Sequence, residues 1–306
     1  MKNEIAILSV GEVLIDFIGN QLNQNVAHTR EYSRYLGGSP TNVAVNMAKL
    51  GQKAVLVSTC GNDGLGNFIQ EELQQAKVET SQIRLLEGVP TSIILVSRSQ
   101  QTPDFIAYRE ADIHIIPEQI PTKLLQRSKI FHTTCFALSK QPTRDTIMQK
   151  AAQAHELGLT LSIDINFSEM IWEHRATALE VIMTYCSYNP LIKISEDDVH
   201  RLFKEKLNQD EVFDFFHKAG ADVICLTKGS QGVSLSHNYK QLFYPAKEIT
   251  EIKDTTGAGD AFWSGFLLAY LKNSGWKDCL KSGLTVAAIK LQHIGGLPEN
   301  ITKTLF

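Results

Sequence analysis

The sequence predicts an α/β fold with three layers, in which a mostly parallel central sheet is covered by helices on both faces. Short apolar runs that suit buried strands alternate with helical patterns along most of the chain, an order typical of parallel sheets. Two segments interrupt this alternation with strand-like patches and no helix between them, which predicts a small second sheet. With 306 residues, the chain is long enough to bury a large core.

The predicted strands of the main sheet are short apolar runs bounded by turn residues or by the start of a helix. They comprise residues 5–10, 54–59, 129–134, 159–165, 191–194 and 223–227, followed by a hairpin at 233–236 and 241–244. The predicted helices comprise residues 40–50, 65–76, 142–157, 177–186, 196–203, 211–219, 258–271 and 277–292. Gly51 and Gly158 directly follow two of these helices, as expected of residues that end a helix.

The small second sheet is predicted from two segments, at about residues 12–36 and 91–110. In the second segment, apolar residues alternate with polar ones at Ile93 and Leu95 and again at Phe105 and Ala107. This alternation favours antiparallel strands with one buried face. A parallel sheet binds ligands at the C-terminal ends of its strands, where such an added sheet would form a lid.

Composition and charge are those of an ordinary globular protein. The formal charge of −3 shows none of the basic excess that usually marks nucleic-acid binding, and no apolar run is long enough to span a membrane. With no targeting segment recognised at the start of the chain, we expect a cytoplasmic protein. The cysteines form no Cys-x-x-Cys pair, so buried thiols are favoured over zinc or dithiol chemistry: Cys60, Cys135, Cys186, Cys225 and Cys279.

The most informative stretch, Asp254–Phe262, reads Asp-Thr-Thr-Gly-Ala-Gly-Asp-Ala-Phe and precedes an apolar helical pattern. Gly257, Ala258 and Gly259 are expected to form a tight turn whose unpaired amides, at the positive end of a helix, bind phosphate. Asp260 would then lie beside the phosphoryl group, where a carboxylate is repelled unless it takes a proton from an attacking hydroxyl. The alternative is an ordinary helix start, with Asp260 as a favourable charge in its first turn.

This stretch resembles the C-terminal signature of the ribokinase-like sugar kinases of the phosphofructokinase B type. Residues 37–44, which read Gly-Gly-Ser-Pro-Thr-Asn-Val-Ala, resemble the N-terminal signature of the same family. The two motifs lie near opposite ends of the chain in the expected order, so the resemblance covers essentially all of it. It implies a single ribokinase-like kinase domain over residues 1–306, with the two extra segments as lid insertions.

The resemblance further implies an ATP-dependent kinase that transfers the γ-phosphate to a sugar hydroxyl with the help of Mg²⁺. Asp260 would be the base, and the amides of Gly257, Ala258 and Gly259 would stabilise the charge of the transferring group. Residues 11–17, which read Gly-Glu-Val-Leu-Ile-Asp-Phe, and the pair Tyr108-Arg109 resemble the fructokinases, which make fructose 6-phosphate. It lacks the motifs of P-loop kinases and of protein kinases.

On the sugar side, the resemblance assigns hydroxyl contacts to Asp16, Gly38 and Asn42, and a position in the substrate site to Arg109. The residues alone also allow other interpretations, in which Asp16 is a solvated loop carboxylate and Asn42 is a helix cap. Arg109 is equally a cation on the lid surface.

On the nucleotide side, Thr227, Gly229 and Gly232 resemble the loop that contacts ATP in this family. Lys193 and Ser195 lie in the segment that normally reads Asn-x-x-Glu, although Ser195 replaces the asparagine. Two further residues differ from the family pattern: Ser168 stands where relatives often carry an arginine, and Leu284 stands where they often carry an asparagine.

Two cation contacts also follow from the resemblance. Asp198 falls where a glutamate usually organises Mg²⁺ through water. Asp254 would help to order the anion-binding loop around a monovalent cation such as K⁺, as in some relatives.

The substrate stays open at this stage. The alternatives to fructose are 2-keto-3-deoxygluconate and 5-dehydro-2-deoxygluconate, whose carboxylates would need a cation such as Arg109. A sugar-binding regulator without activity is a further alternative, although binding alone does not require the base Asp260. A homodimer formed through the exposed edge of the lid sheet is equally open.

Overall fold

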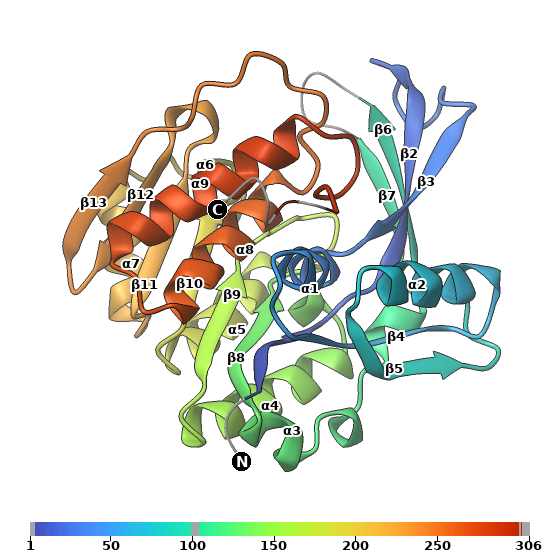
Figure 1. The fold of residues 1–306 in the computed structure, drawn as a ribbon, viewed down its shortest axis with the longest axis horizontal. Coiled ribbons are helices and arrows are strands. Elements are labelled where there is room, and N and C mark those ends of the chain that lie inside the picture. Colours follow the sequence, from blue (N-terminus) through green and yellow to red (C-terminus); the bar gives the residue numbers. More distant parts are fainter. Residues whose placement is uncertain (1–3, 99–103, 300, 302–306) are drawn as a thin grey trace.

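The main sheet has nine strands in the computed structural model, which describes residues 4–98, 104–299 and 301. From one edge to the other, the strands are β13 (Lys240–Tyr244), β12 (Val233–His237), β11 (Val223–Thr227), β10 (Leu191–Ser195), β9 (Thr160–Asp164), β8 (Ser128–Thr134), β1 (Ile5–Val10), β4 (Ala54–Gly61) and β5 (Glu79–Leu86). The strands from β11 to β5 are parallel, whereas β12 and β13 form the predicted antiparallel hairpin. The predicted α/β class is therefore confirmed (Figure 1).

Helices cover both faces of this sheet because neighbouring residues of each strand point to opposite sides. In β1, Ile7 packs with one set of helices and Leu8 with the other. The first set comprises α1 (Ser39–Lys49), α2 (Gly64–Gln75), α8 (Ala258–Leu271) and α9 (Trp276–Leu291). The second set comprises α3 (Thr122–Gln126), α4 (Thr143–Glu156), α5 (Arg175–Cys186), α6 (Glu196–Phe203) and α7 (Gln209–Lys218).

A second sheet of four strands extends from the main sheet where β1 ends (Figure 1). Its strands are β3 (Tyr32–Gly37), β2 (Leu14–Leu22), β6 (Ile93–Arg98) and β7 (Phe105–Tyr108), in that order. The prediction of an antiparallel sheet is wrong for its central pair, because β2 and β6 are parallel. Strand β2 follows β1 in the chain, and β6 follows β5. Because β1 and β5 run in the same direction in the main sheet, β2 and β6 also run in the same direction.

Besides short 3₁₀ turns, the sequence patterns did not predict strand β5 and helix α3. Strand β5 lies at the edge of the main sheet, and its residues are mostly half-buried or exposed. Helix α3 has only five residues, too few to show a helical period. The expectation of buried thiols is confirmed, since all five cysteines are buried and unpaired. No helix within the described residues combines the length and the apolar character needed to cross a bilayer.

Candidate active site

Helix α8 begins at the glycine-rich turn that the sequence predicts. Gly257 is its N-cap and has φ 72°, a left-handed conformation that glycine adopts without a steric penalty. No side chain of the described residues caps this helix, so its positive end is left to bind another group. One detail of the prediction is wrong: the amide of Ala258 is not unpaired, because it donates to the carbonyl of Thr255 at 3.2 Å.

Asp260 lies in the first turn of α8 and is 8% exposed. Two side chains of α1 hold its carboxylate: Ser39 Oγ donates to Oδ1 at 2.6 Å, and Asn42 Nδ2 donates to Oδ2 at 2.8 Å. The N-terminal ends of α1 and α8 therefore meet at this carboxylate, which joins the two motifs found near opposite ends of the sequence. Each carboxylate oxygen keeps a second lone pair, so Asp260 can still accept a proton.

Burial raises the pKa of Asp260, although the charge of Lys193 and the hydrogen bonds from Ser39 and Asn42 act in the opposite direction. Asp16 of β2 is affected in the same way. Burial raises its pKa to about 7, and the negative charge of Asp260 contributes to this rise. Both carboxyl groups therefore hold a proton more readily than an exposed aspartate.

Lys193 of β10 lies beside the same turn. Its ammonium group is paired with Asp164 at the end of β9, with Nζ 3.0 Å from Oδ1 and 2.9 Å from Oδ2. Burial lowers the pKa of Lys193, but the neighbouring carboxylates outweigh this effect and raise it overall, so the side chain is charged. A Cβ atom at Gly259 would lie only 2.8 Å from Nζ, so any larger residue there would displace the lysine.

Gly38 and Asn42 occupy the start of α1. Gly38 is the N-cap, so the interpretation of Asn42 as a helix cap is wrong. A side chain at Gly38 would collide with the carbonyl of Glu12, which an added Cβ atom would approach to 2.4 Å. Glu12 itself is 2% exposed and accepts a hydrogen bond from the amide of Ser39 at 3.1 Å. The turn before α1 is therefore fixed against the end of β1.

Arg109 lies just after β7, and its side chain is only 6% exposed. Its guanidinium group is paired with Asp112, to whose Oδ2 Nε donates at 2.9 Å. Nη1 donates to the carbonyl of Phe136 at 3.1 Å and to Ser139 Oγ, and the Phe136 ring lies 4.3 Å below the group. Arg109 is therefore not an exposed cation of the lid surface, and Asp112 balances its charge.

These features describe a buried carboxylate beside a helix N-terminus, with further carboxylates and a lysine at the C-terminal ends of parallel strands. Residues 5–303 match the family described as pfkB family carbohydrate kinase. The match covers nearly the whole chain. The chain belongs to this family.

Similar proteins carry several substrate names. An ATP-dependent 6-phosphofructokinase of Thermoanaerobacterium thermosaccharolyticum is 34% identical over 96% of this chain and 90% of that protein. A 5-dehydro-2-deoxygluconokinase of Halalkalibacterium halodurans is 26% identical over 94% of this chain and 88% of its own length. The solved structure of Halothermothrix orenii fructokinase superimposes with a TM-score of 0.81 at 31% identity, covering 92% of this chain and 98% of that one.

In this pfkB kinase, the residues predicted to contact the nucleotide lie at the ends of β10 and β11. Ser195 and Thr227 are partners in the register of these strands. Ser195 is the N-cap of α6 and accepts a hydrogen bond from the amide of Asp198 at 3.1 Å. Gly229 begins a short 3₁₀ turn, Gly229–Gln231, whereas Gly232 has a structural reason to be glycine, since a Cβ atom would lie 2.2 Å from the carbonyl of Tyr244.

The predicted cation contacts are both engaged with protein groups. Asp198 is buried and accepts hydrogen bonds from Ser195 Oγ and from Arg201 at 2.8 Å. Asp254 is paired with Lys290, whose Nζ lies 2.9 Å from Oδ2. Among the residues that the structure describes, no three histidine, cysteine or acidic side chains are grouped so that they could hold a metal ion.

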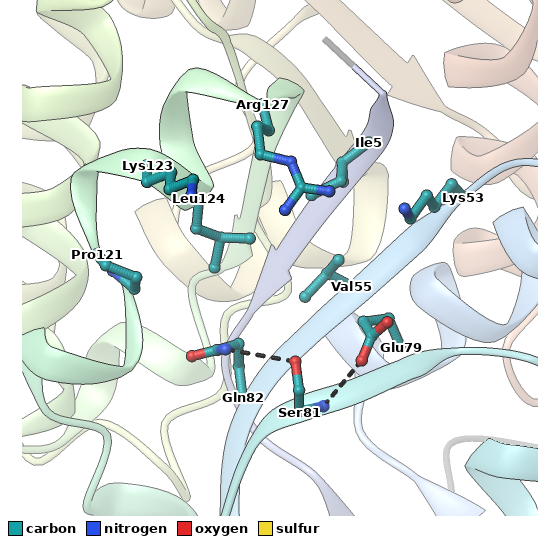
Figure 2. A pocket seen from close by; sticks show the side chains of 10 residues that line it. All are labelled: Ile5, Lys53, Val55, Glu79, Ser81, Gln82, Pro121, Lys123, Leu124 and Arg127. Atoms are coloured by element: carbon teal, nitrogen blue, oxygen red, sulfur yellow. Dashed lines mark hydrogen bonds between the residues drawn. The ribbon is translucent and has the colours of Figure 1, made fainter. Parts of the chain in front are cut away.

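A hollow at the opposite end of the main sheet is lined by basic side chains, including Lys53, Lys123 and Arg127 (Figure 2). It lies where β1, β4 and β5 begin, away from the end of the sheet that carries Asp164 and Lys193. Two of its three basic side chains are paired with Glu4, Arg127 at 3.0 Å and Lys53 at 3.9 Å. This hollow is therefore separate from the candidate active site.

Several residues of the site were not predicted from the sequence. They are Ser39, which binds Asp260; Asp112, which pairs with Arg109; Glu12, which holds the turn before α1; and Lys290, which pairs with Asp254. Ser39 lies within the Gly-Gly-Ser-Pro-Thr-Asn motif, so the motif itself is a signal. Lys290 interrupts an apolar helical pattern, and a lysine in such a position indicates a buried, paired charge.

Proposed function

We propose that this pfkB carbohydrate kinase uses ATP to phosphorylate a neutral ketose, with fructose converted to fructose 6-phosphate as the first choice. The observation that carries the choice is the pairing of Arg109 with Asp112. A sugar acid or sugar phosphate needs a cation whose charge the protein does not already balance, whereas hydroxyl groups need only polar partners. The similarity to a fructokinase of known structure supports the same choice.

In the proposed reaction, Asp16, Gly38 and Asn42 hold the sugar so that one hydroxyl faces Asp260. The hydroxyl oxygen attacks the γ-phosphorus of ATP while its proton passes to Asp260. The new oxygen–phosphorus bond forms as the bond from the γ-phosphorus to the β,γ-bridging oxygen breaks, and ADP leaves. The start of α8 and the ammonium group of Lys193 stabilise the negative charge on the transferring group.

Thr227 and Gly229 would contact the nucleotide from the end of β11, next to Lys193 and Ser195 on β10. Mg²⁺, when bound, neutralises charge on the phosphate oxygens. The residues present fit such an ion if phosphate and water supply most of its ligands, as is usual for Mg²⁺, with Asp198 contacting it through water. The second sheet would act as a lid that excludes water during transfer.

Fructose 6-phosphate is the second candidate, because the 34% identical relative is a 6-phosphofructokinase. For this substrate, Arg109 would have to exchange Asp112 for the phosphate of the sugar. For the keto-deoxygluconates, Arg109 would have to exchange Asp112 for the carboxylate of the sugar. A relative that is 26% identical is named 5-dehydro-2-deoxygluconokinase.

The test is ATP turnover with fructose, fructose 6-phosphate, 2-keto-3-deoxygluconate, 5-dehydro-2-deoxygluconate and ribose, in wild type and in Arg109→Ala. We expect fructose to give the highest kcat/KM, and the variant to lose a similar factor for every neutral sugar. Arg127→Ala, at the far end of the sheet, is the matched control. An anionic sugar that is preferred by wild type, and whose kcat/KM falls selectively by about 30-fold in Arg109→Ala, would replace fructose as the substrate.

A further inference from the structure

Lys290, in the last turn of α9, has a buried ammonium group behind the start of α8. The residue is 3% exposed. Its Nζ donates to Asp254 Oδ2 at 2.9 Å, to the carbonyl of Asp254 at 3.3 Å and to the carbonyl of His293 at 3.3 Å. An ammonium group has three N–H donors, and each has an oxygen acceptor here. The group is thus surrounded by one carboxylate and two carbonyls, the kind of oxygen set that also holds a metal cation.

Asp254 connects this ammonium group to the loop that leads into α8. Its Oδ1 accepts a hydrogen bond from the amide of Thr256 at 2.9 Å, and its Oδ2 accepts one from the amide of Gly295 at 3.1 Å. Burial raises the pKa of Asp254, but the hydrogen bonds from Lys290 and Thr256 outweigh burial and lower it overall, so the carboxylate is charged. The loop before Gly257 and the segment after α9 are therefore held together at one ion pair.

The same oxygens are those that a K⁺ ion at Asp254 would use. Because Lys290 Nζ already bonds both the carboxylate and the carbonyl of Asp254, an added ion would place a second positive charge against the first. The residues present therefore do not fit a bound monovalent cation, and the expectation of K⁺ at Asp254 is not supported by the contacts around it.

We propose that Lys290 is a positioning residue that serves as a covalently attached monovalent cation for the phosphate-binding turn of this kinase. The proposal rests on the proposed function, since the turn is taken to bind the transferring phosphate. Its consequence is that the enzyme needs no K⁺, because the charge that orders the loop is part of the chain.

Two observations connect Lys290 to the reacting groups rather than to stability alone. A Cβ atom placed on Gly257 would lie 3.9 Å from Lys290 Cε and 3.8 Å from Asp260 Oδ2, so the lysine, the turn and the base are neighbours. The charge of Lys290 also opposes the effect of burial on the pKa of Asp260, and so helps to keep the base ionised. Removing the charge should therefore affect turnover as well as the order of the loop.

The first experiment compares turnover in choline chloride and in KCl at equal ionic strength. Wild type should change by less than about twofold between the two salts. Lys290→Ala, which leaves room for an ion, should lose about tenfold or more in kcat in choline chloride and recover part of it in KCl or ethylammonium chloride. Lys290→Met removes the charge but fills the space, so it should show the loss without the recovery. Lys281→Ala, at an exposed position of the same helix, is the control.

The second experiment measures thermal unfolding in the same salts and needs neither sugar nor nucleotide. KCl should raise the Tm of Lys290→Ala relative to choline chloride, because an ion that binds only the folded state stabilises it, and should leave the Tm of wild type unchanged. This readout stays valid if the proposed substrate is wrong. If Lys290→Ala does not fold, the turnover of Lys290→Met in choline chloride tests the proposal instead.

Three results would overturn the proposal. The first is a wild-type enzyme that responds to K⁺ but not to choline, either with a severalfold rise in turnover or with a rise of several degrees in Tm. The second is wild-type activity of Lys290→Met in choline chloride. The third is a folded Lys290→Ala protein that responds to neither K⁺ nor ethylammonium.

Discussion

The carboxylate of Asp260 has two requirements in the proposed reaction: a fixed position and a free lone pair. Ser39 and Asn42 fix it, each by donating one hydrogen bond to a different oxygen. Burial favours the protonated form, whereas the charge of Lys193 favours the carboxylate. The net result is a raised pKa, so Asp260 has a greater proton affinity than an exposed aspartate, which suits a general base.

Asp260→Asn tests this residue directly. The change is nearly isosteric, and both Ser39 Oγ and the amide of Asn42 can reorient to suit the new amide, so the fold should be kept. Because the variant cannot take the proton, kcat should fall by about two to four orders of magnitude. Steady-state kinetics measures the loss. Asp278→Asn, the same change in the exposed first turn of α9, should leave kcat unaltered. Turnover of Asp260→Asn within a few-fold of wild type would remove Asp260 from the role of base.

At this scale, the sequence predicts residues that lie in motifs and misses the charged partners of the cations. Asp260 and Asn42 were identified because each belongs to a recognisable string. The pairings of Arg109 with Asp112 and of Lys290 with Asp254 decide what the cations can do, and they depend on how α9 and the turn after β7 pack. Asp112 is only three residues from Arg109, but no periodic pattern indicates that their side chains pair, whereas Lys290 and Asp254 are brought together only by the tertiary fold.

Helix α8 connects the site to the core. Its first turn carries Asp260, and the following residues pack against the main sheet, α1 and α9, which explains why the helix is apolar nearly all round. Its contact with α9 is close because Gly265 has no side chain: a Cβ atom there would lie 2.7 Å from the carbonyl of Ser282 and 2.8 Å from Val286 Cγ2. The spacing of these two helices also sets where Lys290 meets Asp254.

Gly265→Ala should therefore destabilise the protein even though alanine favours helices. The added methyl group forces α8 and α9 apart, and overpacking of this kind costs about 1–3 kcal/mol in the free energy of unfolding. Urea unfolding measures this cost, and kcat should fall as well because α9 carries Lys290. Gly64→Ala, in the first turn of α2, is the control, since no atom lies within 4 Å of its added Cβ. A Gly265→Ala protein as stable as wild type would show that the two helices can separate freely.

The elements themselves were predicted well wherever a buried apolar segment has distinct ends. The predicted bounds of α6, α8, β1 and β11 agree with the structure, because each has a buried face and a distinct end signal. Strand β5 was missed because only one neighbour pairs with it and five of its eight residues are polar. The direction of β2 relative to β6 could not be inferred from alternation, which is the same in parallel and antiparallel strands.

On the scale of the whole molecule, the C-terminal end of the main sheet and the base of the second sheet bring several carboxyl groups out of water. Burial raises the pKa of Glu12 to about 8, despite the nearby charge of Arg109, and raises that of Asp16 to about 7. Such a concentration of acidic groups is typical of a site that binds polar ligands, and in the ligand-free protein it has a cost that depends on pH.

The sign of this cost follows from proton linkage. The pKa of Glu12 rises from 4.5 to about 8 on folding, so the folded state binds more protons than the unfolded state between these values. The contribution of Glu12 to stability is complete below pH 4.5 and is lost as the pH rises toward 8. His132 acts in the opposite direction but at lower pH, because burial lowers its pKa from 6.5 to about 3. Between pH 6.5 and 8, the carboxyl groups therefore dominate.

We expect the free energy of unfolding of the ligand-free protein to fall as the pH is raised from 6.5 to 8.0. One extra proton on the folded state corresponds to about 1.4 kcal/mol for each pH unit, so a loss of about 1 kcal/mol or more is expected from Glu12 alone. Urea unfolding at the two pH values measures it. Glu12→Gln keeps an acceptor for the amide of Ser39 but does not titrate, so its stability should vary less with pH. Glu118→Gln, at an exposed position, should behave as wild type. Equal pH dependence in wild type and Glu12→Gln would mean that Glu12 is already ionised in the folded protein, with its charge balanced by Arg109.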